Sequence, residues 1–251
     1  MHNPAQSSES SVSRPQAFRT THWSVVVSSL NHDSSISQEA LNYLCRMYWY
    51  PVFHFVRRRG YQEHDAQDLT QAFFARLVEK KWLHKVDPQK GRFRSFLLMI
   101  LKRFMASEWK RAGALKRAGN LQWLSLSLNS AETRFSGEPV DHATPEQSFE
   151  KQWAMALLET VMQTLRRQYA RENKTQIFDA LKPCLLGSRE SQPYVQIAND
   201  LGLTESSVKV KVHRLRRQYR ECLKAEIAHT VASPSDVEEE LKHLIRVLGR
   251  G

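Results

Sequence analysis

The stretch from Tyr194 to Arg220, YVQIANDLGLTESSVKVKVHRLRRQYR, contains two helical patterns separated by a glycine. Gly202 permits the left-handed turn between them, which would strain a residue with a side chain. Thr204 is a favourable N-cap for the second helix. The side chains expected to be buried are Val195, Ile197, Ala198 and Leu201 in the first helix and Val208, Val212, Leu215 and Tyr219 in the second. This spacing predicts a helix-turn-helix.

The outer face of the second helix is cationic, with small side chains near its start. In a helix-turn-helix the second helix enters the major groove, where its first half meets the base edges. Small residues let the backbone approach, while long cations reach bases or phosphates. We therefore predict DNA contacts by Ser206, Ser207, Lys209, Val210, His213, Arg214 and Arg217. Base contacts are predicted for Lys209, His213 and Arg214, a thymine-methyl contact for Val210, and phosphate contacts for Arg216, Arg217 and Arg220. The alternative is a basic surface helix that contacts no groove.

The composition favours a polyanionic partner. The 251 residues carry a formal net charge of +11, and nucleic acid is the commonest partner for such an excess. The 3 cysteines form no C-x-x-C pair, so neither a disulfide framework nor a zinc site is expected. We expect no metal and no cofactor. No apolar run approaches a membrane span, and the tail MHNPAQSSESSVSRPQ lacks the apolar core of a signal peptide, so we expect a cytoplasmic protein without membrane contact.

The rest of the chain predicts an all-α fold of two small helical domains joined by a linker. Helical periodicity predicts helices at 36–60, 63–83, 92–117, 144–172 and 236–247. Pro51 is expected to bend or divide the first of them, and Thr144 is a good N-cap followed by Pro145. The predicted organisation is an N-terminal tail at 1–35, a first domain at 36–117, a linker at 118–148, a second domain at 149–224 and an extension at 225–251.

The helix at 92–117 interleaves cations with aromatic residues. This pairing suits single-stranded or melting DNA, where cations follow phosphates and rings stack on unpaired bases. The other interpretation, favoured for most of the rings, is ordinary core packing. The rings in question are Phe93, Phe96, Phe104 and Trp109. Core packing leaves the cations Lys102, Arg103, Lys110 and Arg111 unexplained.

The order of these features resembles an extracytoplasmic-function (ECF) type RNA polymerase sigma factor. DAQDLTQAFFARL (65–77) is similar to the family's region-two helix, and GRFRSFLLMILKRFMASEWKR (91–111) resembles the melting and recognition helix that follows it. The helix-turn-helix stretch resembles region four. The motifs HWSVV, YWYP and RRRGY, together with the C-terminal extension, resemble the group abundant in planctomycetes.

The resemblance implies partners and roles. The partners would be promoter DNA and core RNA polymerase, contacted at its β′ clamp helices and β flap, with an anti-sigma factor as a possible regulator. Clamp-helix binding would fall to Asp65, Asp68 and Gln71, although from the residues alone these acids equally suit a helix start. The −10 element would meet Lys102, Arg103, Glu108, Lys110 and Arg111. The −35 element would be contacted by the second helix of the helix-turn-helix.

The sequence departs from the family pattern at several positions. Phe96-Leu97 replaces a common Trp-Leu, Arg103 replaces a common Asn, and Ala72 replaces a Glu common in the docking helix. Base preference and docking strength can therefore differ from those of typical members. The extension is absent from minimal members; it is expected either to pack on the second domain, to bind a partner, or to remain a solvated helix.

Two other classes of function predict different features. A free-standing helix-turn-helix regulator would bind palindromic sites as a dimer and make no polymerase contact. A recombinase or nuclease would need clustered carboxylates or a nucleophile beside cations. Asp65 and Asp68 lie one turn apart but have no further acidic partner in the sequence, which argues against an enzyme.

Overall fold

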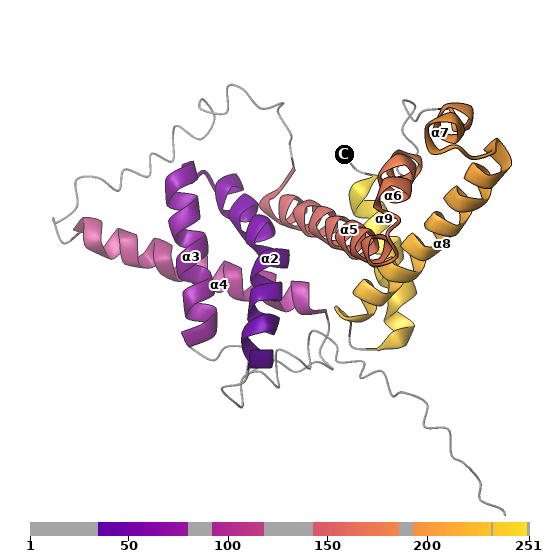
Figure 1. The fold of residues 1–251 in the computed structure, drawn as a ribbon. Helices are drawn as coiled ribbons and strands as arrows, with labels where there is room; N and C mark the ends of the chain where they lie inside the picture. Colours follow the sequence, from indigo (N-terminus) through magenta and orange to yellow (C-terminus); the bar gives the residue numbers. More distant parts are fainter. Residues whose placement is uncertain (1–34, 80–91, 118–142, 186–192, 232, 250–251) are drawn as a thin grey trace, which may run out of the picture.

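The protein is all-α throughout the residues that the structure, a computed structural model, describes: 35–79, 92–117, 143–185, 193–231 and 233–249 (Figure 1). The α-helices are α2 (Ser35–Arg58), α3 (Glu63–Glu79), α4 (Phe93–Arg117), α5 (Pro145–Arg171), α6 (Thr175–Leu181), α7 (Tyr194–Leu201), α8 (Glu205–Ala228) and α9 (Val237–Leu248). Short 3₁₀ turns are η3 (Lys182–Cys184) and η4 (Pro234–Asp236). None of the helices in these ranges combines the length and apolarity that crossing a membrane requires.

Helix α2 runs without interruption from Ser35 to Arg58, with Pro51 inside it. Of the two outcomes expected at Pro51, a bend or a division, division does not occur. A proline removes one backbone hydrogen bond, but here the turns on both sides of it are fixed by burial. Tyr48, Val52 and Phe55 are each at most 2% exposed, and Pro51 itself is buried. Tertiary packing thus outweighs the local preference.

Aromatic contacts connect α4 to both α3 and α2. The ring centroids of Phe73 in α3 and Phe104 in α4 lie 5.6 Å apart, edge to face. Tyr48 in α2 meets Phe93 in α4 at 5.3 Å in the same geometry. Such pairs contribute about 0.5–1.5 kcal/mol beyond their buried area. The segment 80–91, which includes the end of the predicted 63–83 helix, lies outside the described residues.

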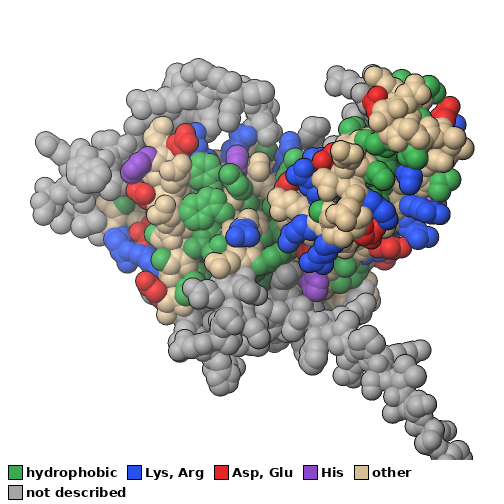
Figure 2. All heavy atoms as spheres, viewed as in Figure 1, with side chains coloured by type: hydrophobic (Ala, Val, Ile, Leu, Met, Phe, Trp, Pro, Cys, Tyr) green, Lys and Arg blue, Asp and Glu red, His purple; other side chains and the backbone are tan. Residues whose placement is uncertain are grey.

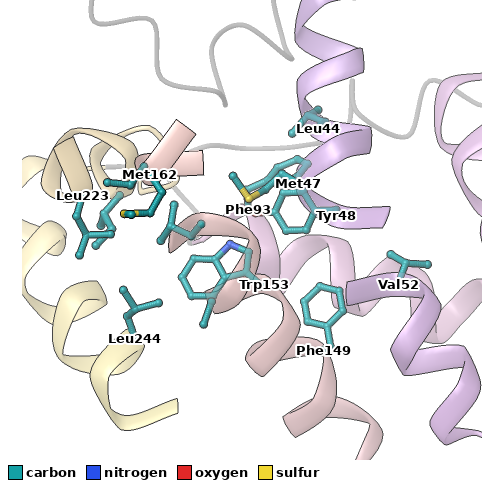
Figure 3. Close-up of a cluster of buried hydrophobic side chains, with 14 of the residues drawn as sticks. Leu44, Met47, Tyr48, Val52, Phe93, Phe149, Trp153, Met162, Leu223 and Leu244 are labelled. Carbon is teal, nitrogen blue, oxygen red and sulfur yellow. The ribbon is translucent and has the colours of Figure 1, made fainter. Parts of the chain in front are cut away.

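Helix α5 joins the two ends of the molecule (Figure 1). It begins as predicted at Thr144, whose hydroxyl accepts the Gln147 N–H while the Gln147 side chain accepts the Thr144 N–H, a capping box. Its buried seam faces α2 on one side and α8 and α9 on the other. Figure 3 shows Trp153 at the centre, between Phe149 and Tyr48 on one side and Leu223 and Leu244 on the other.

The C-terminal helix α9 packs on the molecule and is not a solvated tail. Its contacts are with α5 and α8, and Leu244 is 1% exposed among them. Glu240 on the same helix is completely buried. Helix α8 continues to Ala228, a turn beyond the predicted end of the second domain, and thereby supplies Ile227 to this contact.

Candidate nucleic-acid interface

Helices α7 and α8 are joined by a tight turn. Gly202 adopts φ 63° and ψ 34°, the left-handed conformation that glycine accepts without strain. The Leu203 N–H then donates to the Ala198 carbonyl at 2.8 Å, which closes the end of α7. Thr204 starts α8, because its hydroxyl accepts the Ser207 N–H at 3.2 Å.

Burial separates an inner and an outer face of α8. Val208, Val212 and Leu215 are at most 2% exposed, as expected, whereas Tyr219 is only half-buried. In α7 the prediction holds for Ile197 and Ala198, and Leu201 is half-buried. It is wrong for Val195, which is 54% exposed because this short helix turns only one narrow face to its neighbours.

The outer face of α8 gathers most of the residues predicted to contact DNA. An open depression is lined by Lys209, Val210, His213, Arg214 and Arg217. Val210 is half exposed, so its isopropyl group is accessible to a partner such as a thymine methyl. Ser206 is exposed and Ser207 is half-buried, where its hydroxyl accepts from Thr204 at 2.9 Å. Figure 2 shows Lys and Arg side chains gathered on the α8 side of the molecule.

Several of these cations have partners in the free chain. Lys209 pairs with Glu205 at 2.7 Å and Arg217 with Glu221 at 3.6 Å, both at one-turn spacing and both exposed. Exposed pairs of this kind are weak, so a phosphate can displace the carboxylate. Arg216 differs: it donates to the Cys184 carbonyl at 2.9 Å and so ties α8 to η3. That bond uses one of the five guanidinium N–H groups, and Arg216 is exposed, so other N–H groups stay available for its predicted phosphate contact.

Replacing Thr204 with alanine is expected to destabilise the protein by about 1 kcal/mol, the usual cost of losing an N-cap side chain. Denaturant titration followed by circular dichroism measures this loss. Thr164→Ala is the matched control, because Thr164 lies in the middle of α5 and caps no helix. Equal effects of the two substitutions would contradict the capping role of Thr204.

A second cationic surface lies on α4. Lys102, Arg103, Lys110 and Arg111 are all exposed, and Trp109 presents 60% of its surface. The core interpretation holds for Phe93 and Phe104, which are at most 2% exposed; Phe96 is half-buried. Trp109 is thus the ring that remains accessible for stacking. In Figure 1 the C-terminal part of α4 extends past α3, away from α7 and α8.

Acids engage part of this α4 surface. Glu108 pairs with Arg76 of α3 and accepts from Arg111 at 3.1 Å, so its carboxylate supports the α3–α4 contact before any DNA arrives. The Lys102 ammonium lies 2.8 Å from a carboxylate oxygen of Glu146, in the first turn of α5. That hydrogen bond lowers the pKa of Glu146 from its ordinary value.

The residues predicted to bind polymerase lie on α3. Asp65, Asp68 and Gln71 are all exposed and follow one another at one-turn intervals. Asp68 has one close ionic neighbour among the described residues, the His64 ring at 3.5 Å, which is itself 85% exposed. The half-buried side chain beside them, Ala72, offers no polar group. Asp65, Asp68 and Gln71 therefore form an exposed, acidic surface on α3.

A buried charged network at the base of α4 was not found from the sequence. Arg94 is 3% exposed, and its Nε lies 2.7 Å from a carboxylate oxygen of Glu240 in α9. Its guanidinium also pairs with Glu150 of α5. The guanidinium carbon lies 4.8 Å from the centroid of the Trp153 ring, which it covers. Arg92 donates from its Nε to Glu240 at 2.9 Å. Arg94 and Glu240 lie 146 positions apart, and no local spacing pattern reveals such a pairing.

Residues 44–114 match the family model described as Sigma-70 region 2. The matched segment contains most of α2, all of α3 and nearly all of α4, which are the helices that carry the acidic α3 surface and the cationic α4 surface. Neither the curated proteins nor the solved structures contain a significant match to the chain. The comparisons therefore support a sigma-factor family through residues 44–114.

Proposed function

We propose that this chain is an ECF-type sigma factor, a non-enzymatic subunit that binds core RNA polymerase and directs promoter-specific transcription initiation. The observation that carries the proposal is the Sigma-70 region 2 match over residues 44–114, which coincides with the two exposed charged surfaces of α3 and α4. The planctomycete-type affiliation and a cytoplasmic location belong to the same proposal.

In this proposal the two surfaces have separate tasks. The acids of α3, Asp65 and Asp68 with Gln71, dock on the β′ clamp helices. The cations of α4 follow the phosphates of the −10 element. Trp109 stacks on an unpaired base, because aromatic side chains of proteins that bind single-stranded DNA commonly stack on bases. Glu108 holds Arg111 in position beside them.

The outer face of α8 supplies the second promoter contact. As the second helix of a helix-turn-helix it would enter the major groove of the −35 element, with the β flap of polymerase behind it. The support is the tight turn at Gly202, the cap at Thr204 and the exposed cations of the α8 depression. Two contacts held on one chain give selectivity for the spacing between elements as well as for their sequence. An anti-sigma factor would be a further partner.

The test is co-purification of the tagged chain with bacterial core RNA polymerase. The intact chain should bind stoichiometrically, and the variant Asp65→Lys/Asp68→Lys should bind more than about tenfold more weakly, because like charges facing each other across an interface cost several kcal/mol. The control is Glu159→Lys/Glu172→Lys, which makes the same charge change at an exposed position of α5 and at its exposed C-cap.

Each outcome separates this proposal from the free-standing regulator, which α7 and α8 alone would also suit. Loss of binding in the α3 variant but not in the α5 variant supports a polymerase subunit. Failure of the intact chain to bind polymerase, with tight binding to palindromic duplex DNA, would overturn the sigma-factor proposal. Equal loss in both variants would show a general charge effect and remove the assigned role of α3.

A further inference from the structure

The carboxylate of Glu240 connects the C-terminal helix to the proposed promoter-binding helix. It accepts from the Arg94 Nε at 2.7 Å and from the Arg94 Nη2 at 3.2 Å, and the Arg92 Nε lies 2.9 Å away. Helix α9 itself packs on α5 and α8, so it belongs to the same unit as the α8 surface. Glu240 therefore extends from that unit to the first turn of α4.

Other bonds also join the helices α2 and α4 to the unit formed by α5, α8 and α9. Arg94 also pairs with Glu150 of α5, whose carboxylate meets the His243 ring of α9 at 2.9 Å. The Tyr43 hydroxyl of α2 donates to Glu226 of α8 at 3.0 Å. Ionic and hydrogen bonds therefore surround the apolar contact between α2 and α5. They join α4 to α5 and α9, and α2 to α8.

A buried ion network of this kind is a poor device for stability alone. Removing charges from water costs nearly as much as their mutual attraction returns, and apolar residues of similar size often serve better. What such a network does provide is a definite geometry, because each donor and acceptor must be matched. Glu240, with no exposed surface, is matched only when α4 lies against α5 and α9.

In the closed arrangement, with α4 against α5 and α9, a carboxylate of α5 also pairs with Lys102, a residue predicted to contact the promoter. When α4 lies against α5, the first turn of α5 places Glu146 at 2.8 Å from the Lys102 ammonium, and Arg59 of α2 lies 3.7 Å from the same carboxylate. A DNA phosphate approaching Lys102 meets this negative charge. The α5 carboxylate and the phosphate therefore compete for one cation.

We propose that α9 is an autoinhibitory clamp, in which Glu240 holds α4 against the α5–α9 unit until polymerase and promoter DNA draw α4 away. The inference rests on the proposed function. When a ligand binds only the open form, its apparent affinity is its intrinsic affinity multiplied by the fraction of molecules that are open. Loosening the clamp raises that fraction and tightens binding, even though no residue of the promoter surface has changed.

The test compares Glu240→Gln with Glu239→Gln, a neighbouring acid that is 74% exposed and pairs with Arg92 at 3.6 Å. Promoter-fork DNA is titrated into each variant bound to core polymerase. Glu240→Gln should bind about fivefold or more tightly than the intact chain, within the usual range of couplings between sites. Glu239→Gln should match the intact chain. Denaturant titration of each variant establishes that it is folded.

A measurement on the unmodified chain keeps the inference testable if Glu240→Gln fails to fold. Carboxyl groups are labelled with a carbodiimide and an amine and located by mass spectrometry, with exposed Glu239 as the internal control. Glu240 should resist labelling in the free chain and become labelled in the complex with polymerase and promoter. Protection of Glu240 in that complex, or equal affinities in the titration, would overturn the clamp alone. No binding of polymerase by any variant would overturn the proposed function and the clamp with it.

Discussion

Replacing Trp153 with alanine is expected to lower the free energy of unfolding by about 3–5 kcal/mol. Its indole is fully buried, and truncating a buried aromatic side chain loses its transfer free energy and leaves a cavity. The Arg94 guanidinium, 4.8 Å from the ring centroid, would also lose the aromatic face it covers. Chemical denaturation followed by far-ultraviolet circular dichroism measures the change.

The control is Trp109→Ala, which removes the same side chain from an exposed position and should change stability by no more than about 0.5 kcal/mol. The shape of the transition carries further information. Because Trp153 lies between α2 and the α8–α9 pair (Figure 3), its loss should weaken one cooperative transition of the whole chain. Equal costs for the two tryptophans would contradict the central position of Trp153. Two separate transitions, only one of them shifted, would contradict a shared core.

The helices of this fold were largely predictable because each carries local information. Apolar periodicity located α2, α4 and α8, and Thr144 and Thr204 marked two helix starts through their capping hydroxyls. The same rules left two outcomes open at Pro51, a bend or a division, where burial decides between them. Pro51 forbids one backbone hydrogen bond but is enclosed by packed turns, and no local rule weighs that packing.

The candidate site was predictable to the extent that its residues share one helix. The exposed cations of α8 follow from placing its apolar residues inward. Whether an aromatic residue on α4 is buried does not follow, because helices on several sides are available to cover it: Phe104 is enclosed and Trp109 is not. The network of Arg94, Glu150 and Glu240 depends on which helices meet, so only the tertiary structure reveals it.

Replacing Arg214 with alanine is expected to weaken binding of the polymerase complex to its −35 element by about 5- to 150-fold, the 1–3 kcal/mol that a base-specific contact typically contributes. Arg214 is exposed in the α8 depression, within the half of the helix that would enter the groove. The loss should be selective. Against DNA in which the contacted base pair has been changed, the intact chain and Arg214→Ala should bind about equally, and titration against a set of single-base variants identifies that pair.

Arg217→Ala provides the matched comparison, since it removes the same charge one turn further along the same depression. As a predicted phosphate contact, Arg217 should weaken binding to every sequence by a similar factor and reduce the slope of log affinity against log salt by about 1. The Glu221 carboxylate, 3.6 Å away in the free chain, already offsets part of its charge, so the measured change in slope should not exceed that value. If both substitutions weaken all sequences alike, α8 follows the DNA backbone without reading bases, and the predicted −35 recognition by Arg214 is wrong.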